Sequence, residues 1–299
     1  MKRIDWARLA GALAFSISLA ACTTTTGKNL RPDGTPAEGV EVGERSSFRT
    51  LIPEAELEQA ADQQYQALLS ESKKGGVLVS KSNAQAKRLD RIAKRIIPFT
   101  TRFNPDSSNW KWEVNLLKTK EANAFCMPGG KIAFYTGLID GLKLSDDEIA
   151  IVMGHEMAHA LREHARAQMG KAKATSTGLS IFSAATGGKH DSLLQMGENL
   201  LNLKFSRDDE SEADAVGLDL AARAGYDPRA GISLWNKMGG NSSLDFLSTH
   251  PSDSNRIQHI ESLLPNVMPL YEKAIAQKGG SGKKARSSGT NKKQQKGSK

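Results

Sequence analysis

The segment Gly154–His159, GHEMAH, constrains this chain of 299 residues more than any other feature of its sequence. On a helix, His155 and His159 lie on the same face, one turn or about 6 Å apart along the axis. Two imidazoles at that spacing can bind one Zn²⁺, and Glu156 can then serve as the general base toward water that the metal activates. Because HExxH arises by chance in roughly one chain in a hundred of this length, a metal site needs support from elsewhere in the sequence.

The residues before this segment predict that it lies on a helix. Ser145, followed three residues later by Glu148, is a capping-box signature, and Asp146 and Asp147 suit the positive end of a helix. We expect this helix to continue to about Met169.

A catalytic zinc site needs a third protein ligand and leaves its fourth position to water. His164 is the nearest candidate, but at 100° per residue it points roughly 180° away from His155, which predicts a solvent-facing histidine. The sequence also lacks the third histidine of the metzincin arrangement, because Arg162 and Ala165 occupy the positions where a glycine and that histidine would stand.

A better candidate lies on a helix predicted over residues 208–224. Glu210 and Asp214 share a face of this helix with small residues, which allows close packing against another helix. A buried carboxylate needs a partner, and zinc provides one. We therefore predict Glu210 as the third ligand, with Asp214 placed to hold the outer nitrogen of a ligand histidine.

The same helix carries a second pair of carboxylates at helical spacing, Asp208 and Glu212. They fall near Asp219 on the opposite, polar face of the helix, so we expect them to be solvated.

Four stretches in this order resemble the HtpX and CAAX-prenyl-protease family of zinc endopeptidases, which are gluzincins. They are NAFCMPGGKIAFYTGLI, GHEMAHALREH, SRDDESEADAVGL and STHPSDSNRI. The resemblance covers about residues 51–264 and is closest to periplasmic lipoprotein members of the LoiP and BepA type. The chain lacks the transmembrane helices of the HtpX branch, which fits a lipid-anchored form instead.

The resemblance implies an α+β, mainly helical metallopeptidase domain with a small β-sheet beside the active-site helix. It implies one Zn²⁺ per chain with His155, His159 and Glu210 as ligands and Glu156 as the base, in agreement with the helical geometry. It also places Asn123–Phe125 on an edge strand beside the cleft, where strand addition would bind an extended peptide.

Two residues of the last stretch remain open. His250 precedes a predicted helix and is either a structural loop histidine or a residue that faces the zinc, where it would block the water position or stabilise the oxyanion. Arg256 faces the cleft or forms a surface salt bridge.

The N-terminus predicts export. Residues 1–21 have the basic start, apolar run and small residues of a signal peptide, and LAAC resembles a lipoprotein box that places lipid on Cys22. Plain secretion is the alternative. Residues 22–50 are polar and rich in Gly and Pro, as in a flexible tether. The other cysteine, Cys126, then lacks a disulfide partner and is expected to be a small buried residue, with a reactive thiol as the alternative.

The C-terminus explains the basic charge. Eight Lys and Arg after residue 277 equal the net charge of +8, so the domain expected over residues 51–272 is near neutral. Residues 273–299 are predicted to be a disordered tail, and nucleic-acid binding is not expected.

The remaining patterns predict helices over about 53–70, 83–97, 193–203, 228–238 and 253–264. A strand is predicted over 111–119, followed by a turn at Pro128–Gly130, a strand through Ile132 and Phe134, and a helix from about Thr136.

Together these features predict a zinc endopeptidase that a lipid anchors in the periplasm, at the outer membrane. Its expected substrates are misfolded or stalled envelope proteins. The alternative is a chaperone-like assembly factor for outer-membrane proteins that carries a latent zinc site.

Overall fold

A computed structural model describes residues 38–175, 196–197, 200–201, 203–239, 244–251 and 255–290, with side chains as far as residue 277. The expected signal peptide and Cys22 lie outside these residues. So do most of the expected tether and the last nine residues of the tail.

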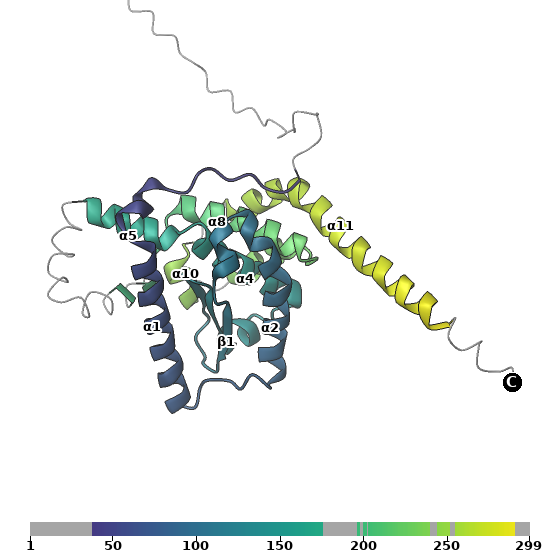
Figure 1. Ribbon diagram of the computed structural model, residues 1–299, viewed down its shortest axis with the longest axis horizontal. Coiled ribbons are helices and arrows are strands. Elements are labelled where there is room, and N and C mark those ends of the chain that lie inside the picture. Colours follow the sequence, from purple (N-terminus) through teal and green to yellow (C-terminus); the bar gives the residue numbers. More distant parts are fainter. Residues whose placement is uncertain are drawn as a thin grey trace, which may run out of the picture. The chain divides into compact units, whose positions relative to one another are not determined.

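The described residues form a mainly helical α+β fold with a small sheet, as the sequence predicts (Figure 1). The short 3-10 helices are η1 (Ser47–Leu51), η2 (Ile97–Arg102) and η3 (Pro105–Asn109), and the strands are β1 (Glu113–Leu117), β2 (Ala124–Met127) and β3 (Lys131–Tyr135). The helices are α1 (Glu54–Lys74), α2 (Ala84–Ile96), α3 (Thr136–Gly141), α4 (Asp146–Leu161), α5 (His164–Ala174), α8 (Arg207–Arg223), α9 (Ala230–Gly239), α10 (Asp245–Thr249) and α11 (Arg256–Thr290).

The sheet has the strand order β1-β3-β2, with β1 parallel and β2 antiparallel to β3. The predicted turn joins β2 to β3, and both Gly129 and Gly130 adopt positive φ there. The outer side of β1 is covered, since Val79 donates to the Leu116 carbonyl. No described strand pairs with the outer side of β2, which makes β2 the open edge of the sheet.

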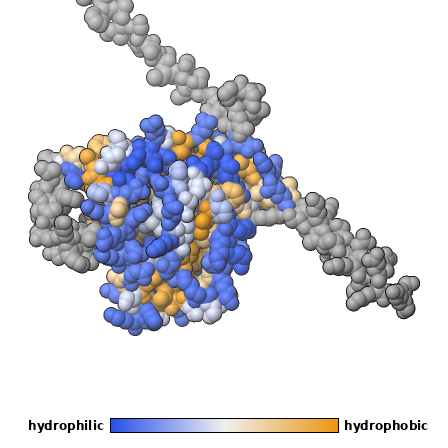
Figure 2. Space-filling model, viewed as in Figure 1, coloured by the Kyte–Doolittle hydropathy of each residue, from blue (hydrophilic) through white to orange (hydrophobic). Residues whose placement is uncertain are grey.

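Helix α4 lies at the centre of the packing. It begins with the predicted capping box, in which the Ser145 hydroxyl accepts from the Glu148 N–H while the Glu148 carboxylate accepts from the Ser145 N–H. Residues 148–161 are all buried, because α2, α8, α9 and the sheet all pack against this helix. The hydrophilic residues that cover most of the face in Figure 2 belong to the surrounding elements.

The crossing of α4 and α8 is the closest helix contact at the site. A Cβ atom at Gly154 would lie 2.6 Å from the Gly217 carbonyl oxygen, and one at Gly217 would lie 2.7 Å from the His155 nitrogen. The two backbones therefore touch, as the small residues beside Glu210 and Asp214 led us to expect.

The end of α4 differs from the prediction. The helix ends at Leu161 rather than near Met169, because Glu163 adopts the left-handed conformation, with φ of 58°, and the chain turns there. A separate helix, α5, begins at His164, so the 100° periodicity of α4 does not apply to that residue.

The N-terminal segment before η1 packs onto the domain, although we expected a flexible tether as far as residue 50. Val40 is buried and its N–H donates to the Asp219 carboxylate, which also binds Arg223. Asp219, predicted to lie on a polar face, is thus fully buried.

At the other end, α11 continues to Thr290 and so extends through much of the segment that we expected to be disordered from residue 273. Among the described helices, none has the length and apolar character needed to cross a membrane.

Replacing Gly217 with Ala should separate α4 from α8, because the added methyl group meets backbone atoms that cannot rotate away. We expect a loss of about 1–3 kcal/mol in the free energy of unfolding and weaker binding of a divalent metal ion, measured by urea denaturation and by competition with a chelator. Gly141→Ala is the control, since a Cβ there meets no atom within 4 Å. Equal effects of the two substitutions would contradict the role of the crossing.

Candidate active site

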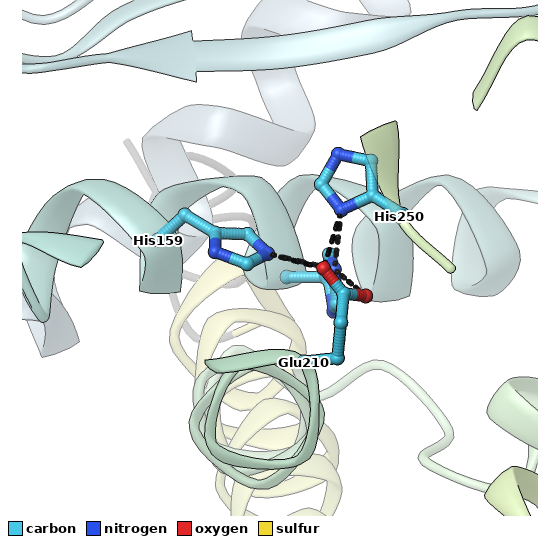
Figure 3. Close-up of side chains that lie close together, drawn as sticks. His159, Glu210 and His250 are labelled. Atoms are coloured by element: carbon cyan, nitrogen blue, oxygen red, sulfur yellow. Dashed lines mark hydrogen bonds and ion pairs between the residues drawn. The ribbon is translucent and has the colours of Figure 1, made fainter. Parts of the chain in front are cut away.

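Four buried side chains from three parts of the chain converge beside α4. They are His155 and His159 of α4, Glu210 of α8 and His250, which follows α10. One ligand atom from each of them lies within 4.8 Å of every other. Figure 3 shows His159, Glu210 and His250 pointing toward one another.

The distances within this cluster fit a tetrahedral metal ion. Nε2 of His155 lies 3.1 Å from Nε2 of His159 and 3.4 Å from Oε2 of Glu210, and Nε2 of His159 lies 3.4 Å from Oε1 of Glu210. Ligand atoms bound tetrahedrally at about 2.0–2.1 Å from one ion are about 3.3 Å apart. Two imidazole nitrogens cannot stabilise each other without a proton or a metal between them, so the donor set fits a bound cation.

Glu156 lies next to this cluster without joining it. Its Oε1 atom is buried, has no hydrogen-bond partner and lies 3.6 Å from Nε2 of His250. Burial raises the pKa of the Glu156 carboxyl, although His250 and His155 oppose the shift. A carboxylate whose pKa is closer to neutrality is a better general base.

Two buried groups hold the cluster, Asp214 of α8 and Arg256 of α11. Asp214 Oδ1 lies 3.0 Å from Nδ1 of His155, the position expected for a carboxylate that orients a ligand histidine. Arg256 donates to both carboxylates, at 2.8 Å to Glu210 Oε2 and at 2.7 and 2.8 Å to Asp214. The guanidinium group also lies 3.5 Å from the centroid of the Trp235 ring.

Burial and the neighbouring charges shift the pKa values of the clustered side chains strongly. Burial lowers the pKa of His155, but the Glu210 and Asp214 carboxylates outweigh burial and raise it to about 9. For His159 burial prevails, so its pKa is well below the ordinary value. Burial opposes ionisation of Glu210, yet the surrounding histidines lower its pKa, and the carboxylate stays charged.

The structure thus brings together every residue that the sequence singled out around GHEMAH. His250 is buried inside the cluster, with Nδ1 2.9 Å from Oε1 of Glu210, so it is not a peripheral loop residue. Arg256 is buried and does not form a surface salt bridge.

His164 is where the sequence prediction is wrong. The residue is buried, and its Nδ1 lies 2.9 Å from Nδ1 of His159 because α5 starts a new helical phase after the turn at Glu163. Glu212, expected to be solvated, binds His164 and Arg162. Asp208 is exposed, as expected.

Two aromatic residues of the site were not anticipated. Phe205 stacks on the His159 ring with centroids 3.8 Å apart, and Phe246 stacks on the His250 ring at 4.4 Å. Phe205 and Phe246 lie just before the stretches SRDDESEADAVGL and STHPSDSNRI. Neither residue belongs to a sequence pattern that predicts stacking on a histidine ring. The Phe246 N–H donates to the Ala122 carbonyl, which ties α10 and His250 to the chain just before β2.

A pocket opens between the cluster and the open edge of the sheet. Its walls include the segment Asn123–Pro128, containing β2, together with Glu156, His159, Phe205 and His250. Asn123 and the predicted edge strand therefore border the site. Cys126, expected to be buried, is half-buried and lines this pocket.

The comparison with known proteins agrees with this geometry. Residues 83–264, more than half of the chain, match the sequence profile of peptidase family M48. The chain belongs to peptidase family M48. This membership confirms the resemblance drawn from the four sequence stretches.

Named relatives of this M48 peptidase are metalloproteases. It is 32% identical over 247 residues to mitochondrial metalloendopeptidase OMA1 of Schizosaccharomyces pombe, which covers 80% of this chain and 69% of that protein. It is 30% identical over 258 residues to metalloprotease LoiP of Escherichia coli, and this match covers 83% of this chain and 94% of LoiP. It is 31% identical over 198 residues to metalloprotease YcaL of the same organism, and this match covers 64% of this chain and 74% of YcaL. The family and these relatives identify the chain as a metalloendopeptidase.

Arg256→Leu tests the charge balance of the site. The substitution leaves the buried Glu210 and Asp214 carboxylates without their guanidinium partner, so we expect a loss of about 3–5 kcal/mol in the free energy of unfolding without metal. Added divalent metal should restore part of this loss, which thermal unfolding in chelator and in excess metal will measure. The control is Arg229→Leu, whose exposed pair with Asp227 should leave the free energy of unfolding nearly unchanged.

Proposed function

We propose that this chain is a zinc-dependent endopeptidase that cleaves polypeptides bound in extended form. The observation that carries this proposal is the position of Glu156, a buried carboxylate whose Oε1 atom has no hydrogen-bond partner, between the ligand cluster and the pocket beside β2. Two histidine nitrogens and one carboxylate form a donor set that suits zinc. We assign His155, His159 and Glu210 as its ligands.

In the proposed reaction, the chain's own groups bind the peptide and move the protons. A metal ion held by the three ligands supplies a Lewis acid beside the scissile carbonyl. Glu156 accepts a proton from the attacking water as the water oxygen bonds to the carbonyl carbon. Glu156 then delivers that proton to the leaving nitrogen as the C–N bond breaks.

The open edge of β2 supplies the binding surface for the substrate. Its outward N–H and C=O groups can pair with an extended peptide, which places the peptide backbone along the pocket toward Glu156. Phe125 is half-buried on this strand and, with Leu203 and Phe205, gives the pocket an apolar wall. We therefore expect unfolded segments with apolar side chains to be preferred.

The cellular setting is inferred from the sequence. The signal-peptide pattern and Cys22 support lipid anchoring in a bacterial periplasm, at the outer membrane. Unfolded or stalled envelope proteins are the substrates that such a location and an extended-peptide site would meet. The similarity to LoiP and YcaL, two bacterial metalloproteases, fits this setting.

One observation favours a second function, a chaperone-like assembly factor with a latent site. His250 lies close enough to join His155, His159 and Glu210 as a fourth ligand. A zinc ion with four protein ligands keeps no open position for water, and such sites are structural. In that state the pocket and the β2 edge would bind polypeptides without cutting them.

Glu156→Gln tests catalysis directly. The substitution keeps the size of the side chain and the metal ligands but removes the base, so cleavage of unfolded casein should fall by about 10²–10⁴-fold while bound zinc is retained. Metal content and cleavage products of the purified chain are the measurements. Equal cleavage by wild type and variant would contradict the proposed mechanism.

His250→Ala distinguishes the two functions in the same assay. If His250 closes the site, its removal should raise cleavage above the wild-type rate, provided that Glu156 is intact. If the wild-type chain already cleaves and the variant is slower, His250 assists the reaction and the latent function is contradicted.

Cys22→Ala tests the anchor. The wild-type chain should incorporate radiolabelled fatty acid and sediment with outer membranes after expression in a Gram-negative host. The variant should lose the label and appear in the soluble periplasmic fraction. Membrane sedimentation of the variant together with unlabelled wild type would contradict lipid anchoring at this residue.

A further inference from the structure

A chain of contacts extends from the buried outer nitrogen of His159, away from the metal cluster. Nδ1 of His159 lies 2.9 Å from Nδ1 of His164, and Nε2 of His164 lies 2.8 Å from Oε2 of Glu212. The other oxygen of Glu212 lies 2.9 Å from Nη2 of Arg162. The side chain of His164 is 4% exposed and that of Glu212 is 26% exposed, so water does not readily replace the contact between the two histidines.

The position of His159 in the metal cluster determines which nitrogen donates in each of these hydrogen bonds. Nε2 of His159 faces Glu210 and offers its lone pair to a metal, so the proton of the neutral ring is on Nδ1. That N–H donates to Nδ1 of His164, which therefore carries its own proton on Nε2 and donates it to Glu212. Glu212 accepts from His164 and pairs with the guanidinium of Arg162, which balances the charge of its carboxylate.

The two histidines of GHEMAH are thus oriented in different ways. His155 donates directly to a carboxylate, Asp214, as ligand histidines commonly do. His159 reaches its carboxylate, Glu212, only through His164. We propose that His164 is a positioning residue that fixes the tautomer and ring orientation of His159, and that Glu212 in turn fixes those of His164. This inference rests on the proposed role of His159 as a metal ligand.

The fold is built to make this contact. The left-handed residue Glu163 turns the chain directly after α4 and returns His164 toward His159. Arg162 is buried in the same turn and donates both to Glu212 and, at 2.5 Å, to the Gly43 carbonyl of the N-terminal segment. The turn therefore secures both ends of the relay formed by His164 and Glu212.

Zinc affinity of the purified full-length chain, measured by competition with a chromophoric chelator, tests the proposal. His164→Leu removes both hydrogen bonds and should weaken zinc binding about 10–100-fold, the usual effect of losing a partner of a ligand histidine. His164→Asn should recover much of the loss, because its amide oxygen can accept from Nδ1 of His159. Equal losses in the two variants would overturn the proposed hydrogen bond.

Variants of α8 test the second half of the relay. Glu212→Ala should weaken zinc binding, whereas Asp208→Asn, at an exposed carboxylate one turn earlier on the same helix, should not. The double variant His164→Leu with Glu212→Ala should bind zinc within about twofold of His164→Leu alone, because both substitutions interrupt one chain of contacts. Additive losses would overturn the relay.

Leu161→Ala separates positioning from general stability. Leu161 is fully buried near the end of α4, so its truncation should lower the unfolding midpoint but leave zinc affinity within about twofold of wild type. If Leu161→Ala and His164→Leu weaken zinc binding equally, the positioning role is wrong. If wild type binds zinc and His164→Leu binds it equally well, the relay is wrong and the proposed metal site stands. If wild type binds no zinc, the proposed function itself fails.

Discussion

The contact between Gly154 of α4 and Gly217 of α8 is the constraint on which the site depends. The two helices cross so closely that a single methyl group on either glycine would meet backbone atoms of the other helix. This approach sets Glu210 within 3.4 Å of both His155 and His159 and places Asp214 on the outer nitrogen of His155. A wider crossing would take Glu210 away from both histidines and Asp214 away from His155, so Arg256 alone would pair the two buried carboxylates.

The charges around this crossing compensate one another within a small volume. Glu210 and Asp214 are buried, and the guanidinium of Arg256 binds both while resting on Trp235. Such an ensemble contributes little net stability, but removing one member leaves an unpaired buried charge. The arrangement suits a site that must hold a cation, since the carboxylates remain ionised and the ligand atoms keep their spacing. Around it, ring stacking by Phe205 and Phe246 limits the rotation of His159 and His250.

Much of the site could be predicted because four of its residues lie on two regular helices, α4 and α8. Within one helix the spacing of residues determines which side chains share a face, so His155, His159, Glu210 and Asp214 were accessible from sequence. Periodicity could not place their counterparts outside regular helices, and for His250 the sequence left open both a structural loop position and a position facing the zinc. His250 and Phe246 belong to a short helix and the loop after it, where position depends on a backbone bond to Ala122 rather than on periodicity. The same limit applies to residues 38–50, whose packing depends on Asp219, about 180 residues away.

By itself, the sequence determined the class of the protein, the helix that carries GHEMAH, its cap and the face of α8 that meets it, because these follow from local periodicity and from motifs of fixed spacing. Only the tertiary structure decided which polar residues are buried. Residue Glu163 breaks α4 with a left-handed conformation, and that one turn moves His164 from the expected solvent side to the side of His159. Glu212 was expected to be solvated, yet it is only partly exposed because it binds Arg162 and His164. Arg256, for which the sequence left a surface position open, is buried at the site. Burial of a charge depends on what packs against it, and no local pattern carries that information.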